Sequence, residues 1–523
     1  MSRAAGTIGF FTLLSRILGL VRDMVLAYFF GSQMAADAFF VAFRIPNLLR
    51  RFFAEGSLTI AFIPVFTETL TQKSKEDAFE LARAVLTLLS LLLVAVTILG
   101  VLLAPWIVRI QAYGFGASGA KYELTVLLTR ITFPYIFLVS VVAFFMGVLN
   151  SLRHFAAPAA APILLNVGII AGALCLSPWL SEPVVGVAIG VLIGGVLQVL
   201  LQIPWIVKKG LSLRPLWMPG HPAVKKIGLL MLPAVFGSAV YQVNQFIGTL
   251  LASFLAQGSI SWLYYADRIV EFPLGVFAIA VSTAALPSLA TQVAGKDFSE
   301  FRDTLGHALR LVFFITTPAT VGMIILRVPI IEVFFQRGAF DRTATLMTAE
   351  ALLFYSLGLW AFSASRVMLS AFYAFQDTKT PVKVATITMV ANGLLSLLLM
   401  GPLRHGGLAL SLSLSSTVQL LLLIVLLRKR GDLFDFQSMI SAGARSLAAA
   451  AVMGIVLYEL NEKWLSRTAP GHVWALALTL TGVIVVGAAV YFLAAWIFRC
   501  PEISSILGML KPVAGKTNRK EGP

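Results

Sequence analysis

Long apolar segments separated by short polar loops run from one end of the chain to the other. A membrane-spanning helix needs about 20 mostly apolar residues, and the pattern predicts about fourteen such helices. Their expected ranges are 7–31, 36–66, 83–110, 124–150, 157–180, 184–206, 225–255, 262–292, 305–330, 345–374, 382–401, 406–428, 438–460 and 472–498. We expect the second range to be broken, because it contains Pro46 and several charged residues.

Composition supports the same architecture. Of the 523 residues, 59% are hydrophobic and only 12% are charged, whereas a soluble domain carries roughly 25% charged residues. A chain this apolar must use lipid as its solvent. The first apolar segment continues past Arg16 and Arg22 without a cleavage pattern, so we expect a retained helix and no cleaved signal peptide. The predicted fold class is an all-α polytopic membrane protein.

The basic residues of the loops indicate an orientation. The net charge is +16, and Lys and Arg are concentrated in every second loop. The loops at 31–37, 177–183 and 256–261 contain neither residue type, although Arg337 and Arg342 lie in one loop of the same set. Because loops rich in Lys and Arg stay in the cytoplasm, both termini are expected there. Charge in short membrane loops also argues against a nucleic-acid partner.

An internal repeat divides the chain. Residues 186–210 align without gaps on 407–431, matching glycine, alanine, glutamine and a terminal basic pair. A similar offset places Pro158 on Pro381 and Arg44 on Arg268. Each repeat would hold six helices, so the two share one orientation, as in transporters built from parallel repeats around a central site. The predicted domains are a first lobe (1–215), a second lobe (216–432), a C-terminal helix pair (433–500) and a cytoplasmic tail (501–523).

Ionisable residues inside the spans are concentrated in the first two helices of each repeat. Such residues are costly in lipid and usually line a cavity or a pathway. The stretch from Arg16 to Glu55 contains five Arg and three acidic residues, so we expect some guanidinium groups to need an anion from outside the chain. The planar guanidinium fork suits phosphate oxygens, which favours a phosphate or pyrophosphate ligand. The alternative for Asp23, Asp37, Asp267 and Glu271 is a role in interhelical salt bridges.

Signs of catalysis are missing from the sequence. The five His are scattered, the two Cys lie far apart, and no metal-ligand spacing, Walker A loop or GxSxG motif occurs. We therefore expect neither a metal nor a cofactor, and a transporter in place of an enzyme. The glycines of GVLIGG (190–195) predict close helix packing.

Three motifs resemble the MurJ/MviN family closely: the stretch from Ser15 to Phe66, residues 261–290, and FYAFQDTKTPVK at 372–383. The resemblance covers nearly the whole chain. It implies fourteen helices in two six-helix lobes around a cavity, with a C-terminal pair forming a hydrophobic groove. It also implies a flippase that moves lipid II, the undecaprenyl-pyrophosphate-linked precursor of peptidoglycan, to the outer leaflet of the bacterial inner membrane by alternating access. Lipid II, membrane lipids and other cell-wall synthesis proteins are the partners it implies.

The resemblance also suggests site residues. Those expected to bind substrate are Arg16, Arg22, Arg50 and Arg268. The resemblance further suggests that Asp37 and Glu55 line or gate the cavity, and the position of Asp267 and Glu271 inside a span predicts the same for them. Some relatives bind sodium, and Asp377 is the one candidate here for such an ion site; the energy source stays open.

Other functions remain alternatives. A flippase for another polyprenyl-pyrophosphate-linked glycan would need the same arginines. A membrane glycosyltransferase would need carboxylates near the outer face, and Asp341 and Glu332 lie near such a loop without a supporting motif. The MurJ/MviN family belongs to the multidrug/oligosaccharidyl-lipid/polysaccharide exporter superfamily. Drug/cation antiporters of that superfamily have twelve helices and favour cations, which the surplus of Arg opposes.

Overall fold

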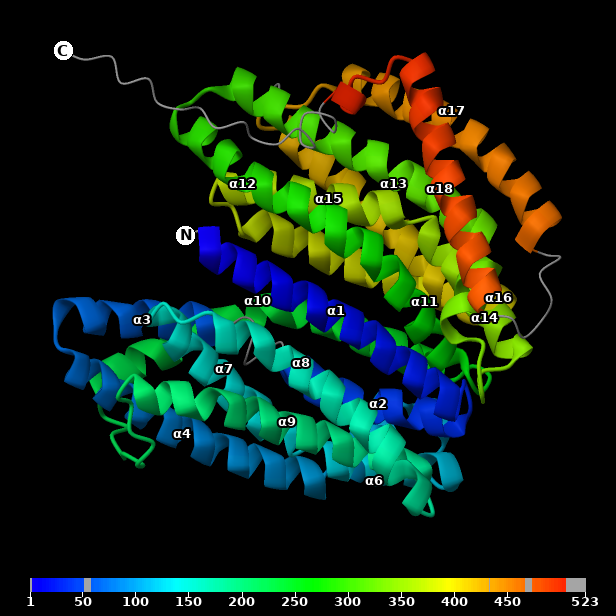
Figure 1. The fold of residues 1–523 in the computed structure, drawn as a ribbon. Helices are drawn as coiled ribbons and strands as arrows, with labels where there is room; N and C mark the ends of the chain where they lie inside the picture. The colour runs from blue at the N-terminus through cyan, green and yellow to red at the C-terminus, as the bar shows by residue number, and fades with distance from the viewer. Residues whose placement is uncertain (1, 51–57, 432, 466–472, 505–523) are drawn as a thin grey trace, which may run out of the picture. The chain divides into compact units, whose positions relative to one another are not determined.

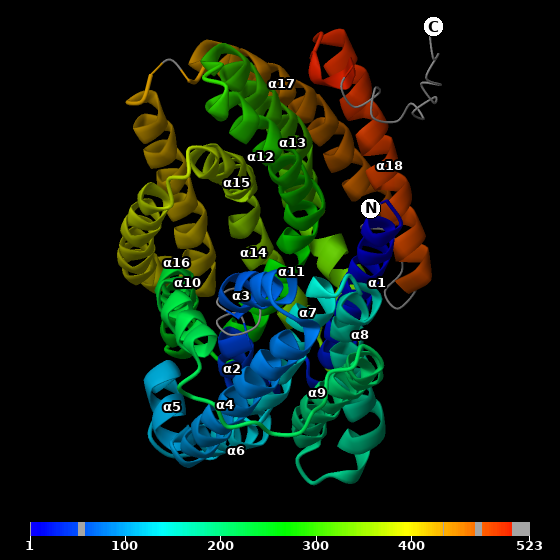
Figure 2. The ribbon, with the colours of Figure 1, turned by 90° about the vertical axis from the view of Figure 1, so that its left-hand side faces the viewer.

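The computed structural model describes residues 2–50, 58–431, 433–465 and 473–504, without the side chains of 2–5, 49–50, 58–60 and 232–241. All elements in these ranges are helices (Figures 1 and 2). The longer ones are α1 Ser2–Phe30, α2 Met34–Arg50, α3 Leu58–Gln72, α4 Lys75–Leu102, α5 Ala104–Gln111, α6 Ala120–Thr132, α7 Tyr135–Ser151, α8 Ala156–Ala171, α9 Pro183–Lys208, α10 Pro222–Ser253, α11 Ser259–Pro273, α12 Ile279–Ala294, α13 Phe298–Phe335, α14 Arg342–Ser356, α15 Leu359–Ala374, α16 Lys379–Arg428, α17 Phe436–Leu460 and α18 Val473–Ile497. Short 3-10 or π turns are η2 Tyr113–Phe115, η3 Gly172–Leu176, η4 Ser177–Trp179, η5 Leu274–Ala278 and η6 Asn461–Leu465.

The all-helical membrane architecture predicted from the sequence is confirmed. Within the described ranges, nine helical segments are long and apolar enough to cross a membrane, or ten if the bent pair α14–α15 counts as one span. One of the nine, α16, is two helices joined at Arg404, whose φ of 49° and ψ of −130° are not helical. Its two arms correspond to the predicted ranges 382–401 and 406–428. The total of fourteen spans stays a prediction.

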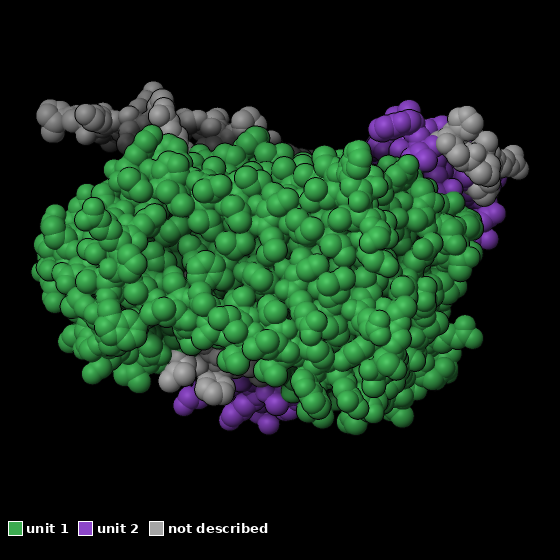
Figure 3. All heavy atoms as spheres, turned by 90° about the horizontal axis from the view of Figure 1, so that it is seen from below, with its two compact units in different colours: residues 1–268, 334–351, 389–411 green, residues 269–333, 352–388, 412–523 purple. Residues whose placement is uncertain are grey.

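Contacts divide the chain into two compact units (Figure 3). Unit 1 comprises residues 1–268, 334–351 and 389–411, and unit 2 comprises 269–333, 352–388 and 412–523. The division groups residues by contact and not by repeat, so the predicted lobe boundaries after residues 215 and 432 stay predictions.

Within unit 1, glycines let α8 and α9 pack closely, as the GVLIGG sequence predicted. A Cβ atom on Gly190 would lie 2.5 Å from the carbonyl oxygen of Gly168, and one on Gly194 would lie 2.9 Å from the Cα of Leu165. These neighbours are backbone atoms, which cannot rotate away as a side chain can. Small residues at this interface therefore set the distance between the two helices.

Two helix ends that the predicted repeat aligns share one backbone turn. Arg153 after α7 and Gln376 after α15 occupy repeat-equivalent positions, and each has a φ of 56°. The next amide closes the same turn in both places: His154 N donates to Leu149 O at 2.8 Å, and Asp377 N donates to Phe372 O at 3.0 Å. A left-handed residue followed by this bond is the Schellman ending of a helix. The same turn also ends α9, α12 and α18, so the repeat stays a prediction.

Candidate functional site

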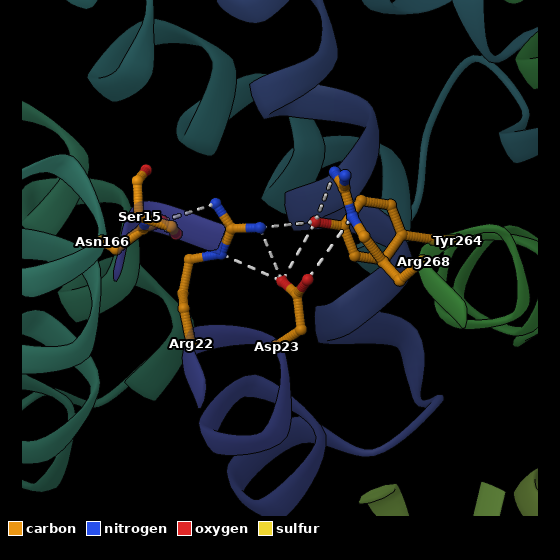
Figure 4. Close-up of polar contacts among 6 residues, drawn as sticks. All are labelled: Ser15, Arg22, Asp23, Asn166, Tyr264 and Arg268. Atoms are coloured by element: carbon orange, nitrogen blue, oxygen red, sulfur yellow. Dashed lines mark hydrogen bonds and ion pairs between the residues drawn. The ribbon is translucent and has the colours of Figure 1, made fainter. Parts of the chain in front are cut away.

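A cluster of charged and polar side chains lies in unit 1 around Arg22 of α1, and we call it the Arg22 cluster (Arg22, Asp23, Asn166, Tyr264 and Arg268; Figure 4). The Arg22 guanidinium donates to Asp23 Oδ1 from Nη2 at 2.7 Å and from Nε at 2.9 Å. It also donates to Asn166 Oδ1 at 3.1 Å and to the Tyr264 hydroxyl at 3.1 Å. All three nitrogens of Arg22 are therefore engaged within the protein.

Arg268 of α11 joins the same carboxylate. Its Nε lies 3.4 Å from Asp23 Oδ2, and its Nη2 donates to the Tyr264 hydroxyl at 3.2 Å. Its guanidinium also lies 4.8 Å from the centre of the Tyr264 ring, which adds a cation–π contact. The Arg268 side chain is 32% exposed, compared with 12% for Arg22 and 1% for Asp23.

The Arg22 cluster holds two guanidinium groups and one carboxylate. Two guanidinium groups share the Asp23 carboxylate, so the formal charge of these three residues is +1 in a largely buried place, and Arg268 has a further interaction outside the cluster. Water and salt screen such a charge poorly. Arg268 is the more exposed of the two cations. Arg22, with its donors already engaged, holds Asp23 and Tyr264 in position.

The other residues predicted to bind substrate are not part of the Arg22 cluster as described. The Arg16 side chain is exposed on α1, and the side chains of Arg50 and Glu55 lie outside the described residues. Asp267 and Glu271 are half-buried on α11. Arg44, the repeat equivalent of Arg268, donates to the Gln245 carbonyl and the Thr249 hydroxyl of α10.

Asp37 is the centre of a second polar group, which we call the Asp37 seam (Asp37, Lys121, Gly258 and Ser261). The Asp37 carboxylate is 1% exposed and accepts four hydrogen bonds. Oδ2 accepts from Lys121 Nζ and Gly258 N, each at 2.8 Å. Oδ1 accepts from Ser261 N at 3.0 Å and Ser261 Oγ at 2.7 Å. The first amides of a helix have no partner in the helix and carry partial positive charge, so an anion at the start of α11 is well stabilised.

Backbone contacts extend the Asp37 seam within unit 1. The amide of Ala339 donates to the Tyr28 carbonyl at 2.8 Å. Gly31 has a φ of 56°, and a Cβ there would lie 2.2 Å from the Ala339 carbonyl oxygen. Gly258 has a φ of 97°, and a Cβ there would lie 2.7 Å from the Trp262 ring and 2.9 Å from the Ser32 carbonyl oxygen. The turn after α1 and the segments before α11 and α14 therefore pack without space for a side chain.

Asp377, the candidate for an ion site, makes other contacts. Its carboxylate accepts hydrogen bonds from Thr380 N at 2.9 Å and Thr380 Oγ1 at 2.6 Å, and it pairs with Arg430. Although partial burial opposes its charged form, these hydrogen bonds and the Arg430 charge lower the pKa of Asp377 to about 2. Arg430 also lies over the Phe372 and Phe375 rings. In this structure Asp377 therefore joins the ends of α15 and α16, and within the described ranges no three His, Cys, Asp or Glu residues gather as a metal site would require.

Several members of both polar groups had not been predicted. Asn166 was overlooked, although it is a lone amide in the apolar run of α8, and such a residue signals a polar partner inside the membrane. Tyr264 lies one helical turn before Arg268, a spacing that places two side chains on one face. Lys121 and Ser261 gave no comparable signal, because only the fold brings them to Asp37.

Known proteins resemble this chain in sequence and in fold. The sequence pattern of the family described as "Lipid II flippase MurJ" matches residues 26–479. The "Probable lipid II flippase MurJ" of Vibrio cholerae is 40% identical over 92% of this chain and 93% of its own length. The "Lipid II flippase MurJ" of Burkholderia cenocepacia is 37% identical over 95% and 97%.

Solved structures also resemble this chain. The structure described as "Lipid II flippase MurJ, inward closed conformation" superposes with a TM-score of 0.79 and 28% identity, covering 96% of this chain and 99% of that one. An inward-facing multidrug resistance MATE family transporter superposes with a TM-score of 0.69 at 16% identity, over 80% and 94%, which shows a shared fold alone. The chain belongs to the lipid II flippase MurJ family.

Proposed function

We propose that this multi-pass membrane protein flips lipid II from the inner to the outer leaflet of the bacterial inner membrane. Family membership over nearly the full length is the observation that carries the proposal. The Arg22 cluster supports it physically, because a pyrophosphate linker carries about two negative charges and the cluster brings two guanidinium groups together around a single carboxylate.

Within this proposal, Arg268 contacts the pyrophosphate directly and Arg22 positions the carboxylate and hydroxyl around it. The difference in exposure between the two side chains supports the division of roles. Arg16 and Arg50 complete the set of proposed substrate-binding residues, and Asp37, Glu55, Asp267 and Glu271 line or gate the path.

The proposed orientation places both termini in the cytoplasm. The turns that contain Lys73, Arg153, Lys209, Lys296 and Lys429 then face the cytoplasm, in keeping with the positive charge of such loops. The Asp37 seam lies at the opposite ends of its helices and faces the periplasm. A closed seam on that side corresponds to a transporter that loads from the cytoplasm and opens outward after the substrate binds. Binding supplies the differential affinity that such a shift requires.

Reconstitution tests the function. Purified protein is incorporated into vesicles with fluorescent lipid II, and an impermeant quencher reports the fraction of headgroups that has crossed. The native chain should move lipid II well above protein-free vesicles, and Arg268→Ala should lose most of that rate. Arg268→Lys keeps the charge without the bidentate fork and should recover only part. The matched control is Arg109→Ala, since Arg109 is exposed at the end of α5.

Two results would overturn the proposal. No movement of lipid II by the native chain would remove the function itself. Movement of another polyprenyl-pyrophosphate glycan in place of lipid II would favour the alternative substrate. A normal rate for Arg268→Ala, at equal protein content in the vesicles, would remove the assigned role of that arginine and leave the function standing.

A further inference from the structure

A proline in α13 leaves a backbone carbonyl of unit 2 without its helical partner. In an α-helix the amide of residue 318 would donate to the carbonyl of Phe314, but residue 318 is proline and has no amide hydrogen. The Phe314 side chain is 1% exposed, so this carbonyl lies in a buried region. A buried carbonyl without a partner is costly, and native structures usually supply one.

The hydroxyl of Tyr491 supplies the partner. Tyr491 lies on α18 with 2% of its side chain exposed, and its hydroxyl donates to the Phe314 carbonyl at 2.7 Å. The Tyr491 and Phe314 rings also pack with centres 5.1 Å apart. Ser446 of α17, 1% exposed, lies beside the same hydroxyl. Three helices therefore meet at one group of atoms, which we call the Tyr491 node (Phe314, Ser446 and Tyr491).

Further contacts join the same face of α13 to the C-terminal helices. Arg310 lies one turn before Phe314, donates to the Ser438 hydroxyl of α17 at 3.0 Å and lies 3.6 Å from the Glu502 carboxylate after α18. Glu502 is 2% exposed, so this ion pair is largely shielded from water. Farther along α13, a Cβ on Gly454 of α17 would lie 3.0 Å from Val321. The packing of α17 on α18 (Figure 1) completes the group.

From these contacts we propose that Tyr491 is a positioning residue for lipid transport, fastening the C-terminal helix pair to α13 so that the three helices move as one body. Without the node, α17 and α18 would be held to α13 by apolar contacts, the Arg310–Ser438 hydrogen bond and one ion pair. Apolar contacts between helices in lipid are not directional and permit sliding. A hydrogen bond to a carbonyl that lacks its usual i+4 amide donor favours one register. The transport test of this proposal rests on the proposed function. The tests of the hydrogen bond and of the helix distances, which we call the structural arm, do not.

The structural arm begins with a double-mutant cycle between Tyr491→Phe and Pro318→Ala. Tyr491→Phe keeps the ring and removes the hydroxyl, so the melting temperature in detergent should fall. Pro318→Ala restores an amide that can donate to the Phe314 carbonyl, so adding Tyr491→Phe in that background should lower the melting temperature much less. The control is Tyr458→Phe, because Tyr458 lies on α17 with 58% of its side chain exposed. Equal effects of Tyr491→Phe in both backgrounds would overturn the assigned hydrogen bond.

Distance and transport measurements test the positioning role. Spin labels at Asp303 of α13 and Leu493 of α18, both exposed, should give a narrow distance distribution that Tyr491→Phe broadens. Losing the bond should shift the equilibrium between the fastened and the released states of the helix pair α17–α18 by roughly tenfold. The lipid II flipping rate should then fall several-fold at unchanged protein content.

An unchanged distribution and an unchanged rate, alongside a lower melting temperature, would reduce Tyr491 to a purely structural residue and overturn the proposal. If the native chain moves no lipid II, the proposed function fails, and the distance distribution still decides whether the node fastens the pair.

Discussion

Replacing Asp37 with asparagine should release the Asp37 seam. Each carboxylate oxygen accepts from two donors: Oδ1 from the Ser261 amide and hydroxyl, and Oδ2 from Lys121 and the Gly258 amide. Asparagine is nearly the same size, but its NH₂ group can only donate. Whichever way the amide turns, two donors of the protein face two hydrogens of the new side chain.

The cost follows from burial and charge. At 1% exposure the carboxylate has no water to replace its lost contacts, and Lys121, 19% exposed, loses its ion-pair partner. Removing one member of a buried pair costs about 3–5 kcal/mol. Because about 1.4 kcal/mol is a factor of ten, the equilibrium between closed and open seam should shift by two orders of magnitude or more. Asp37→Asn should therefore populate the open seam and slow each transport cycle.

Spin labels at Gln33 and Gln257, which are exposed on either side of the seam within unit 1, can measure the effect. The native chain without substrate should give a short distance, and Asp37→Asn should add a longer population. Ser261→Ala removes the hydroxyl donor and keeps the Ser261 amide, so its distribution should lie between the two. A distribution that is identical in Asp37→Asn and the native chain, with an unchanged flipping rate, would refute the assignment of Asp37 as the residue that closes this seam.

Three further predictions concern orientation, packing and pH. With the native cysteines replaced, a cysteine at exposed Gln257 should react with an impermeant thiol reagent from the periplasm and one at Lys73 should not; the reverse pattern would invert the orientation. Gly190→Leu should lower the free energy of unfolding by at least about 1–3 kcal/mol and reduce the amount of folded protein in the membrane, because its Cβ meets backbone atoms. Gly482→Leu should be tolerated, because nothing lies within 4 Å of its Cβ. Equal amounts of folded protein for the two variants would contradict the packing. Asp377→Asn should cost about 1 kcal/mol at neutral pH. Because the folded pKa of about 2 is below the ordinary value of 3.8, the native chain should be more stable than Asp377→Asn above pH 4 and should lose this advantage as the pH falls to about 2. If the difference in free energy of unfolding by denaturant stays constant across that range, the charge of Asp377 is not its source.

Patterns that depend on neighbouring residues could be predicted from the sequence. Apolar runs of the length of a membrane determine helices, and the loop charges indicate an orientation, because both effects act on one segment at a time. The glycines at 190–195 predicted close packing, which the contact of Gly190 with Gly168 confirms. The surplus of arginine in the first two helices likewise pointed to an anionic ligand before any partner was known.

Tertiary structure decided how these groups pair. Asp23 serves Arg22 beside it and Arg268 from a distant helix, so one carboxylate holds two arginines that the sequence left as separate candidates. Counting charges along the chain gives the surplus, but it cannot say which cation stays exposed.

The Tyr491 node shows the same limit. Pro318 by itself determines that the Phe314 carbonyl lacks its helical donor, because proline has no amide hydrogen. Which hydroxyl of the chain donates in its place is a matter of distance in space, and α18 begins more than a hundred residues after α13 ends. The sequence determines which groups need partners, and only the packing of the helices decides which partners they receive.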